Sequence, residues 1–374
     1  MSAPIIPLLT TTINTPLSEL TSHLIAQCQN INQWIDSQMA ALPTPIYTSM
    51  DLRHAGFKIA PVDTNLFPGG FNHLHEKVIP DGVKAFQATI QQITAGNHIL
   101  LVPENMTRNP GYFENIASLQ ALLETSGYQV RIGSLLSDLH QTRKLSLPSG
   151  KTITLEPLLI ENHSVHLDNY KPDLILLNND LSDSESDYFT NIKQPVLPNI
   201  HMGWSTRTKT KHFDHYAKIS QDFAEAFNFD PWLITPLHDH CASVNFNTPE
   251  GIADLKSKVT HLLEAIASRY KHYGIAQRPF VAIKADAGTY GMGIMMIHDP
   301  EELDELNKKQ KKNMQKSKTG TSVSSVIIQE GIPTTEMWDT SVAEPVIYAI
   351  GKQVIGGFYR LHQSKNAQEN LNAP

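Results

Sequence analysis

The stretch VAIKADAGTYGMGIMMI, residues 281–297, ends an apolar run on Lys284, continues with three glycines in ten residues and then resumes the apolar run. This pattern predicts two strands joined by a glycine turn. No helix pattern follows the glycines, so the spacing does not fit the dinucleotide-binding fingerprint. Glycine backbone can approach phosphate oxygens closely, and the lysine adds a positive charge. The stretch therefore indicates either a turn that closes over a phosphate group or a plain hairpin with an outward lysine.

The composition is that of a globular protein with a large core. The chain has 374 residues, of which 40% are hydrophobic and 18% charged, and this length favours two or three domains. Its net charge of −7 offers no general attraction for nucleic acid or for an anionic membrane. Cys28 and Cys241 lie far apart, and no apolar run reaches the roughly 18 residues that span a bilayer. We expect a soluble cytoplasmic protein that binds neither nucleic acid nor membrane.

Strands and helices alternate in the first half of the chain, which predicts a βαβ sheet. The predicted strands are 98–102, 128–133 and 173–178, and the predicted helices are 17–41, 82–94 and 113–126. Residues 144–160 read as a hairpin around a Pro-Ser-Gly turn. Gly150-Lys151-Thr152 imitates a phosphate loop, but Leu145 stands where the first glycine of that loop belongs, so the hairpin is favoured. We assign residues 1–204 to an N-terminal α/β domain.

Residues 199–213 break this rhythm with mixed polar, aromatic and basic side chains, and we place a domain boundary there. Beyond it, the predicted helices are 216–228, 250–273 and 300–314, and the predicted strands are 279–285, 293–297 and 325–330. Residues 343–362 read as two strands joined at Gly351-Lys352. The lysine-rich residues 308–320 indicate the solvated end of a helix, because they lack the interleaved aromatic side chains that stack on nucleic-acid bases.

A lysine on a strand, a glycine turn, a strand ending in Gln329-Glu330-Gly331 and a hairpin ending in Arg360 follow one another in this order. The order resembles that of the ATP-grasp ligases from about residue 205 onward. The resemblance implies an ATP-grasp-like lid region over residues 205–332 and the start of an ATP-grasp-like C-terminal region over residues 333–374. Lys209 and Lys211 look like the first nucleotide-contacting lysine of such enzymes, with Lys211 the better placed. A solvated basic loop is the alternative for either lysine.

The most distinctive stretch of the first half is MDLRHAGFKIAPVDTNLFPGGFNHL, residues 50–74. It has too many charged and amide side chains beside a tight Phe-Pro-Gly-Gly turn for a simple core strand, so it indicates a binding site. These side chains are Asp51, Arg53, Lys58, Asp63, Asn65 and Asn72. They offer donors for carboxylates and acceptors for an ammonium group, which suits a zwitterionic amino acid. Together with KADAGTYGMGIM and NLNAP, the stretch closely resembles the proteobacterial type of glutamate–cysteine ligase, and the resemblance extends over the whole chain.

That resemblance implies a ligation in two steps. The γ-carboxylate of glutamate attacks the terminal phosphate of ATP, and the amine of cysteine then displaces phosphate, giving γ-glutamylcysteine in the first step of glutathione synthesis. The residues implied to bind the nucleotide are Lys211, Lys284, Gly288, Tyr290, Gly291, Gly293, Gln329 and Glu330. Those implied to act at the reacting end are Lys284, Arg360 and Asn370. Those implied to bind glutamate are Arg53, Lys58, Asp63, Asn65 and Asn72.

The resemblance also implies Mg²⁺ as a cofactor, but the late acidic motif that supplies its ligands in ATP-grasp enzymes is not seen before Pro374. Glu344, Glu369 and Asn372 have suitable oxygens without forming a full set, and we expect the chain to be shorter than its relatives. A zinc site in LHDHCA, residues 237–242, is disfavoured because adjacent side chains on a strand point to opposite faces.

Two other functions stay open at this point. One is another ATP-dependent carboxylate–amine ligase, such as glutathione synthetase, and the other is a non-catalytic nucleotide-binding protein. The sequence does not identify the contacts of cysteine or the oligomeric state.

Overall fold

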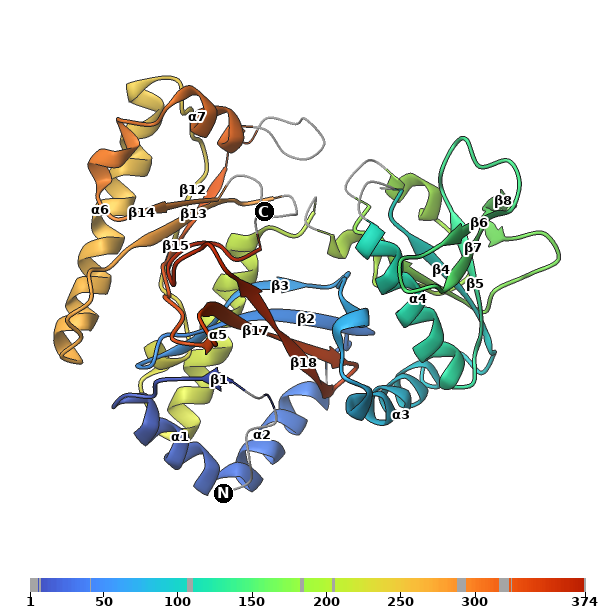
Figure 1. Cartoon of the computed structure of the whole chain (residues 1–374), viewed down its shortest axis with the longest axis horizontal. Helices are drawn as coiled ribbons and strands as arrows, with labels where there is room; N and C mark the ends of the chain where they lie inside the picture. Colours follow the sequence, from blue (N-terminus) through green and yellow to red (C-terminus); the bar gives the residue numbers. More distant parts are fainter. Residues whose placement is uncertain are drawn as a thin grey trace.

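The computed structural model describes residues 6, 8–40, 42–105, 110–181, 185–203, 206–287, 294–315, 323 and 325–372. Three large sheets occupy separate parts of the molecule: a central sheet, a parallel sheet and a four-stranded sheet (Figure 1). This mixed architecture agrees with the expected α/β class. The predicted glycine turn, with Gly288, Tyr290, Gly291 and Gly293, lies outside the described residues.

The central sheet is antiparallel and joins strands from the two ends of the sequence. Its order is β1–β16–β17–β2–β3, and β18 pairs with the other side of β17. The strands are β1 (Leu9–Thr10), β2 (Tyr47–His54), β3 (Ile59–Asn65), β16 (Met337–Trp338), β17 (Ser341–Ile350) and β18 (Gln353–His362). The hairpin predicted around Gly351 is confirmed as β17–β18. The expected domain limits at residues 204 and 332 stay a prediction. This sheet contains strands from before residue 204 and from after residue 332.

The parallel sheet has the order β11–β10–β4–β5–β7–β6, and its strands are parallel except for the β6–β7 hairpin. The strands are β4 (His98–Pro103), β5 (Gln129–Ser134), β6 (Arg143–Ser146), β7 (Thr152–Pro157), β10 (Leu174–Asn178) and β11 (Val196–Leu197). A small pair, β8 (Leu159–Glu161) and β9 (Ser164–His166), follows β7. The βαβ pattern and the hairpin over 144–160 are thus confirmed. β4 and β10 are continuous apolar runs because both faces of this sheet are covered.

The four-stranded sheet is antiparallel and has the order β12–β15–β13–β14. Its strands are β12 (His238–Cys241), β13 (Val281–Ala285), β14 (Ile294–Ile297) and β15 (Val326–Glu330). The long helix α6 (Pro249–His272) packs its apolar stripe, which includes Leu255 and Val259, against this sheet. The two strands predicted on either side of the glycine stretch are therefore confirmed as the neighbours β13 and β14.

The remaining helices cover the sheets. They are α1 (Leu17–Ala26), α2 (Cys28–Ala40), α3 (Ile79–Ile90), α4 (Pro110–Thr125), α5 (Lys209–Phe227) and α7 (Lys308–Gln315), with 3-10 turns η1 (Phe71–His73), η2 (Glu76–Val78), η3 (Glu185–Phe189), η4 (Ile200–Met202), η5 (Pro231–Leu233) and η6 (Pro300–Leu303). In the described part of the chain, no helix is long and apolar enough to cross a membrane.

Three helix predictions are wrong in extent. The helix expected over 216–228 begins at Lys209 as α5, where Thr208 caps it by accepting from the N–H of Lys211. The single helix expected over 17–41 is divided into α1 and α2, because Gln27 leaves the helical conformation and its N–H donates to Leu24 O. The helix expected over 300–314 is divided into η6 and α7. Each of these has its own capping residue: Asp299 accepts from the N–H of Glu301, and Asn307 accepts from the N–H of Gln310.

Candidate active site

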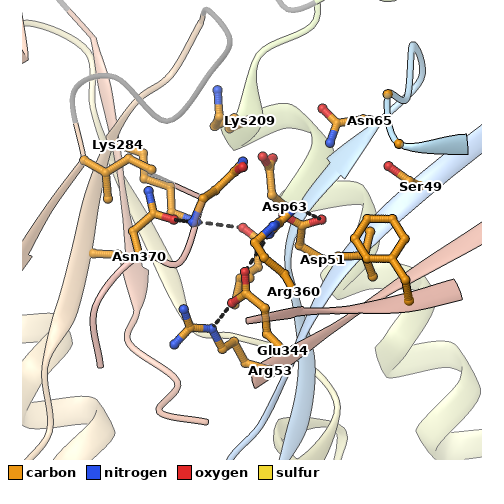
Figure 2. Close-up of a pocket in the computed structure, with 18 of the residues that line it drawn as sticks. Ser49, Asp51, Arg53, Asp63, Asn65, Lys209, Lys284, Glu344, Arg360 and Asn370 are labelled. Carbon is orange, nitrogen blue, oxygen red and sulfur yellow. Dashed lines mark hydrogen bonds and ion pairs between the residues drawn. The ribbon is translucent and has the colours of Figure 1, made fainter. Parts of the chain in front are cut away.

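A cavity of about 900 Å³ lies where the three large sheets meet. The central sheet lines it with Ser49, Asp51, Arg53, Asp63, Asn65, Glu344 and Arg360. The four-stranded sheet lines it with Ala282, Lys284, Ile294, Met296, Gln329 and Glu330. The carboxyl edge of the parallel sheet, with the start of α4, lines it with Glu104, Gly111, Tyr112, Asn115 and Asp180. Figure 2 shows the side chains from the first two sheets facing one another across the pocket.

The charged residues of the central sheet share one face because side chains alternate along a strand. The register places Asp51 opposite Asp63 across β2 and β3, and Glu344 opposite Arg360 across β17 and β18. β17 and β2 are direct neighbours in this sheet. Four strands therefore bring their charges to a single surface at the floor of the cavity.

These charges form a chain of ion pairs that alternate in sign (Figure 2). Arg53 Nε donates to Glu344 Oε2 at 2.6 Å, and Arg360 donates to Glu344 Oε1 at 2.6 Å and to Asp51 Oδ2 at 2.7 Å. Burial raises the pKa of Asp51 to about 6 against the opposing charge of Arg360, and Asp63 and Glu344 add to the rise. Burial alone would lower the pKa of Arg360, but the contacts with Asp51 and Glu344 outweigh it and raise that pKa.

Arg53 also holds the last described segment of the chain against the cavity. Its two terminal nitrogens donate to Ala367 O at 3.0 Å and to Glu369 O at 2.7 Å. Asn370 follows this segment and lines the cavity, and Figure 2 draws it on the same side of the pocket as Lys284. Because its guanidinium is occupied in this way, Arg53 positions the 367–370 backbone.

Lys284 lies at the end of β13 and reaches across to the central sheet. Its Nζ donates to Val62 O of β3 at 2.7 Å and to Gln329 Oε1 of β15 at 2.6 Å. The side chain is only 8% exposed, and burial lowers the pKa of this lysine to about 8. The plain outward lysine that the sequence left open is therefore wrong: Lys284 lines the cavity and bridges two sheets.

A second lysine enters the cavity from the start of α5. Lys209 lines it, whereas Lys211 is exposed and is not among the lining residues. The first three N–H groups of α5 all have acceptors: Lys209 N donates to Asp286 O, Thr210 N to Asp286 Oδ1 and Lys211 N to Thr208 Oγ1. This end of the helix therefore does not need an external anion. Instead, Asp286 ties it to the residues just after Lys284, which sets the direction of Lys209.

The Phe-Pro-Gly-Gly turn that marked the sequence connects the central sheet to the parallel sheet. Asn178 Nδ2 donates to Pro68 O at 2.9 Å, and Phe71 N donates to Asn115 Oδ1 at 2.9 Å. Tyr348 donates its hydroxyl hydrogen to Gly69 O. Gly70 has a φ of +93°, and a Cβ there would lie 2.8 Å from the Tyr348 hydroxyl oxygen, so no larger residue fits. The polar residues around this turn therefore fix a wall of the cavity.

Most of the residues expected from the sequence meet in this one cavity. Those that line it are Arg53, Asp63, Asn65, Asn72, Lys284, Gln329, Glu330, Arg360 and Asn370. Lys58 and Lys211 do not line it. Lys58 is fully buried: its Nζ donates to Glu330 Oε2 at 2.7 Å and lies 4.1 Å from the centre of the Trp232 ring. Lys58 therefore supports β15 from behind the site.

The residues expected to hold a metal ion do not assemble into a site. Glu344 and Asn372 line the cavity, but Glu369 does not, and both Glu344 oxygens are taken by arginines. Within the described ranges, no group of three His, Cys, Asp or Glu side chains could hold a metal ion, and this includes the residues of LHDHCA. A metal site made by the described residues alone does not fit this arrangement.

The sequence patterns did not identify three cavity residues at the carboxyl edge of the parallel sheet: Glu104, Tyr112 and Asp180. Glu104 and Asp180 follow the parallel neighbours β4 and β10, and Tyr112 bridges these strand ends by donating to Asn178 O and accepting from Glu104 N. The chain runs outward in opposite directions from these two strands, and such a switch point is a common place for ligands. The available signal was an acidic residue two positions beyond the end of each of these predicted strands, 98–102 and 173–178.

Comparisons with known proteins give one strong similarity. The family model GshA, described as glutamate-cysteine ligase, matches residues 21–374. Among solved structures, the chain is similar to a protein of Methylobacillus flagellatus KT that carries the name "Putative gamma-glutamylcysteine synthetase", with 43% sequence identity and a TM-score of 0.92. That match covers 100% of this chain and 88% of the other. No curated protein matched the sequence.

Other solved structures are far less similar. A glutathione synthetase-like effector, GSS30 of Globodera pallida, shares 11% identity at a TM-score of 0.40, and the match covers 95% of this chain and 88% of the other. D-alanyl-alanine synthetase A of Vibrio cholerae O1 biovar eltor shares 12% identity at a TM-score of 0.34, with coverages of 70% and 65%. These similarities are too low to support an argument about the site.

Proposed function

Because the chain belongs to the glutamate–cysteine ligase family, we propose that it joins the γ-carboxylate of glutamate to the amine of cysteine through an acyl phosphate made from ATP. The family accounts for glutamate–cysteine ligase activity in glutathione synthesis, for small-molecule substrates and for the use of ATP, usually with a divalent metal ion. The observation that supports the acyl phosphate scheme is a single cavity that is lined both by Lys209 and Lys284 and by the charged residues of the central sheet.

We place the nucleotide along the four-stranded sheet. Phe280, Met296 and Ile332 make the lining apolar near Gly331, which suits a planar base. A Cβ on Gly331 would lie 2.2 Å from the Phe280 ring, so this residue must be glycine if the strand is to pass there. Lys284 and Lys209 then provide cations for the phosphate chain at the other end of the sheet.

We place glutamate over the β2–β3 hairpin. Asp63, Asn65 and Asn72 line the cavity there, and they combine an acceptor for the ammonium group with amide donors for a carboxylate. Arg53 contributes indirectly, because its nitrogens hold Glu344 and the 367–370 segment. The γ-carboxylate of the substrate would then point towards the phosphates.

In the proposed reaction, a γ-carboxylate oxygen attacks the terminal phosphorus of ATP, and ADP leaves with the electrons of the broken P–O bond. The amine of cysteine attacks the resulting acyl carbon, phosphate leaves, and the amine loses a proton to give the amide. The residues of the chain contribute by binding and orienting charge: Lys284 and Lys209 stabilise the negative charge on the transferring phosphoryl group. Arg360 is paired with Asp51 and Glu344, and in this scheme it would stabilise negative charge at the reacting end.

Mg²⁺ is the divalent ion that we propose. This ion keeps several water ligands and is usually bound through substrate phosphates and one or two carboxylates. We also propose that the protein works in the cytoplasm, and its two free cysteines, Cys28 exposed and Cys241 buried, support this because thiols stay reduced there.

The test is ADP release, measured with glutamate plus cysteine, with each amino acid alone, and with glutamate plus 2-aminobutyrate. We expect release with both pairs, because the amine and not the thiol is the nucleophile, and little release with either amino acid alone. A strict requirement for the thiol would contradict the acyl phosphate scheme. An additional assay contains γ-glutamylcysteine plus glycine. Release only with that pair would favour a glutathione synthetase, and ATP binding without any turnover would favour a non-catalytic nucleotide-binding protein.

A further inference from the structure

A guanidinium group that the proposed reaction does not yet use lines the cavity beside the β2–β3 hairpin. Arg207 is partly buried and belongs to the cavity lining. Its Nη2 lies 3.4 Å from Thr64 O, and its Nη1 lies 3.5 Å from Thr64 Oγ1 and 3.2 Å from His212 Nδ1. Thr64 belongs to β3 and stands between Asp63 and Asn65, which both line the cavity. Arg207 therefore lies next to the place that we assign to glutamate.

The contacts of Arg207 with Thr64 and His212 orient its guanidinium without neutralising it. An arginine side chain only donates hydrogen bonds, so His212 Nδ1 must be the acceptor, and the hydrogen of the neutral ring is then on Nε2. His212 Nε2 lies 3.0 Å from Thr64 Oγ1, which can accept this hydrogen. Burial and the charge of Arg207 lower the pKa of His212 to about 4, so the ring is neutral at pH 7. Uncharged groups of two residues thus hold a cation in the wall of the cavity.

The other arginines that line the cavity have a different role. Arg53 and Arg360 donate to buried carboxylates at 2.6–2.7 Å, so their charges are used within the chain. The contacts of Arg207 described above are longer and involve uncharged atoms. Burial lowers the pKa of Arg207 to about 10, and the negative charge of Asp63 acts against this shift. The group is therefore cationic at pH 7, and it lies within the influence of one carboxylate that also lines the cavity.

We propose that Arg207 binds the α-carboxylate of glutamate and that Asp63, beside it, binds the ammonium group. An α-amino acid has these opposite charges on neighbouring groups, and the two side chains offer the complementary charges. The planar guanidinium can form two parallel hydrogen bonds with a carboxylate. Arg207 is then a residue that determines specificity, and His212 is a positioning residue. The inference rests on the proposed function and deepens it, because it names the group that recognises one end of the substrate.

A phosphate oxygen of the nucleotide is the other anion that a guanidinium could bind in this cavity. A phosphate chain has no positive charge for Asp63, and that carboxylate would repel it. A cation and an anion that lie together therefore fit a zwitterion better than a polyanion. The experiment below separates the two ligands.

The test uses two analogues that each lack one charged group of glutamate: 4-aminobutyrate lacks the α-carboxylate, and glutarate lacks the amine. ADP release with saturating 2-aminobutyrate gives the KM for glutamate and the KM for ATP, and each analogue is measured as a competitive inhibitor against glutamate. We expect Arg207→Gln to raise the KM for glutamate and the inhibition constant of glutarate by roughly ten- to a hundredfold, as for loss of a charge-assisted contact. The inhibition constant of 4-aminobutyrate and the KM for ATP should hardly change.

A reciprocal variant tests the other half of the pair. Asp63→Asn should weaken the binding of glutamate and of 4-aminobutyrate, which both have an amine, and should not weaken that of glutarate. Arg143→Gln is the matched control, because it removes an exposed guanidinium that is not among the cavity residues. It should change none of these constants.

His212 is tested through the arginine that it orients. His212→Ala should raise the KM for glutamate by roughly two- to tenfold, as for loss of one hydrogen bond. In a protein that already carries Arg207→Gln, the same change should have almost no effect on this KM. His212→Asn, whose amide oxygen can take the place of Nδ1 as acceptor, should restore part of the loss. Additive effects of the two substitutions would show that His212 does not act through Arg207.

Each other outcome has a distinct meaning. If R207Q leaves the KM for glutamate unchanged, Arg207 does not bind glutamate and the inference is wrong. A rise confined to the KM for ATP would assign the guanidinium to a phosphate oxygen, and equal rises for glutarate and 4-aminobutyrate would show that it does not recognise the α-carboxylate. Either result overturns the inference. If the parent releases no ADP with glutamate, the proposed function itself fails, and the inference fails with it.

Discussion

The two walls of the cavity differ in how their charges are satisfied. On the central sheet, Arg53, Glu344, Arg360 and Asp51 pair with one another within the chain. On the four-stranded sheet, Lys284 and Gln329 keep donors that the described residues do not use. The ion pairs of the first wall are thus satisfied among residues of the chain, whereas Lys284 on the second wall has one hydrogen left for a ligand. We expect substitutions in the first to change stability and substitutions in the second to change binding and rate.

The largest effect should follow from breaking the central ion-pair chain. Glu344→Ala leaves the guanidinium groups of Arg53 and Arg360 without their shared carboxylate in a buried place, so the free energy of unfolding should fall by about 3–5 kcal/mol. Chemical denaturation measures the loss. Asp138→Ala is the control, because its pair with Arg143 is exposed and should contribute less than about 1 kcal/mol. Equal losses in the two variants would show that the buried ion-pair chain contributes no more to stability than an exposed ion pair does.

The corresponding change on the other wall is Lys284→Met, which keeps much of the side-chain volume. Loss of one preorganised cation should lower kcat by roughly 10² to 10³. The melting temperature without ligand should fall only modestly, because the loss of two hydrogen bonds is partly offset by the removal of a buried charge. Rates of ADP release and thermal melts provide the two measurements. Lys211→Met is the matched control on an exposed lysine, and a loss of rate there as large as in K284M would return Lys211 to the site.

A smaller effect is expected for Asp286, which positions Lys209 without lining the cavity itself. Asp286→Ala removes the acceptor of Thr210 N–H, and the loss of such a cap is typically about 0.5–2 kcal/mol. If this residue acts by directing Lys209, D286A alone should raise the KM for ATP. In a protein that already carries Lys209→Ala, adding D286A should change the KM almost not at all, so the two effects are non-additive in a double-mutant cycle. Additive effects would show that Asp286 supports the fold independently of the lysine. Ser325→Ala, which leaves the Asp286–Thr210 contact in place, is the control.

A further expected effect is a dependence of stability on pH. The pKa of Asp51 is raised from an ordinary value of 3.8 to about 6, chiefly by burial. A carboxyl group with a raised pKa binds its proton more tightly in the folded state, so its contribution to stability is present below about pH 4 and is lost as the pH rises to 6. Asp51→Asn should remove this part of the pH dependence of unfolding free energy. Identical profiles for D51N and the parent would argue that Arg360 keeps Asp51 ionised throughout.

Local patterns were sufficient to predict the parallel sheet. Its strands, such as β4 and β10, are short apolar runs that are buried on both faces, and the helices between them have clear apolar stripes. The charged stretch around Asp51 and Asp63 was also recognisable as a site, because its polar residues exceed what a core strand needs. Both features could be predicted because each depends only on the composition and spacing of residues that are close together in the sequence.

Local sequence patterns could not predict which distant strands pair, or which side of a helix faces the cavity. Asp51 pairs in register with Val346 of β17, and nothing in either segment specifies that partner. Lys209 and Lys211 are two residues apart on a helix and therefore point in different directions, so the choice between them depends on where Asp286 fixes the helix start. Lys58 follows the turn after β2, and only the packing of Trp232 and Glu330 shows that it is turned into the core.

The composition of the central sheet also has a consequence for the synthesis of the protein. Because β2 pairs with β17, Asp51 must wait for Val346 to leave the ribosome before the two strands can meet. At a translation rate of roughly 5–20 residues per second, that interval is on the order of 15–60 seconds. During this time the β2–β3 hairpin has an unpaired edge, and such an edge can pair with another chain. We therefore expect the nascent protein to be most prone to aggregation, and most dependent on chaperones, until its last strands are made.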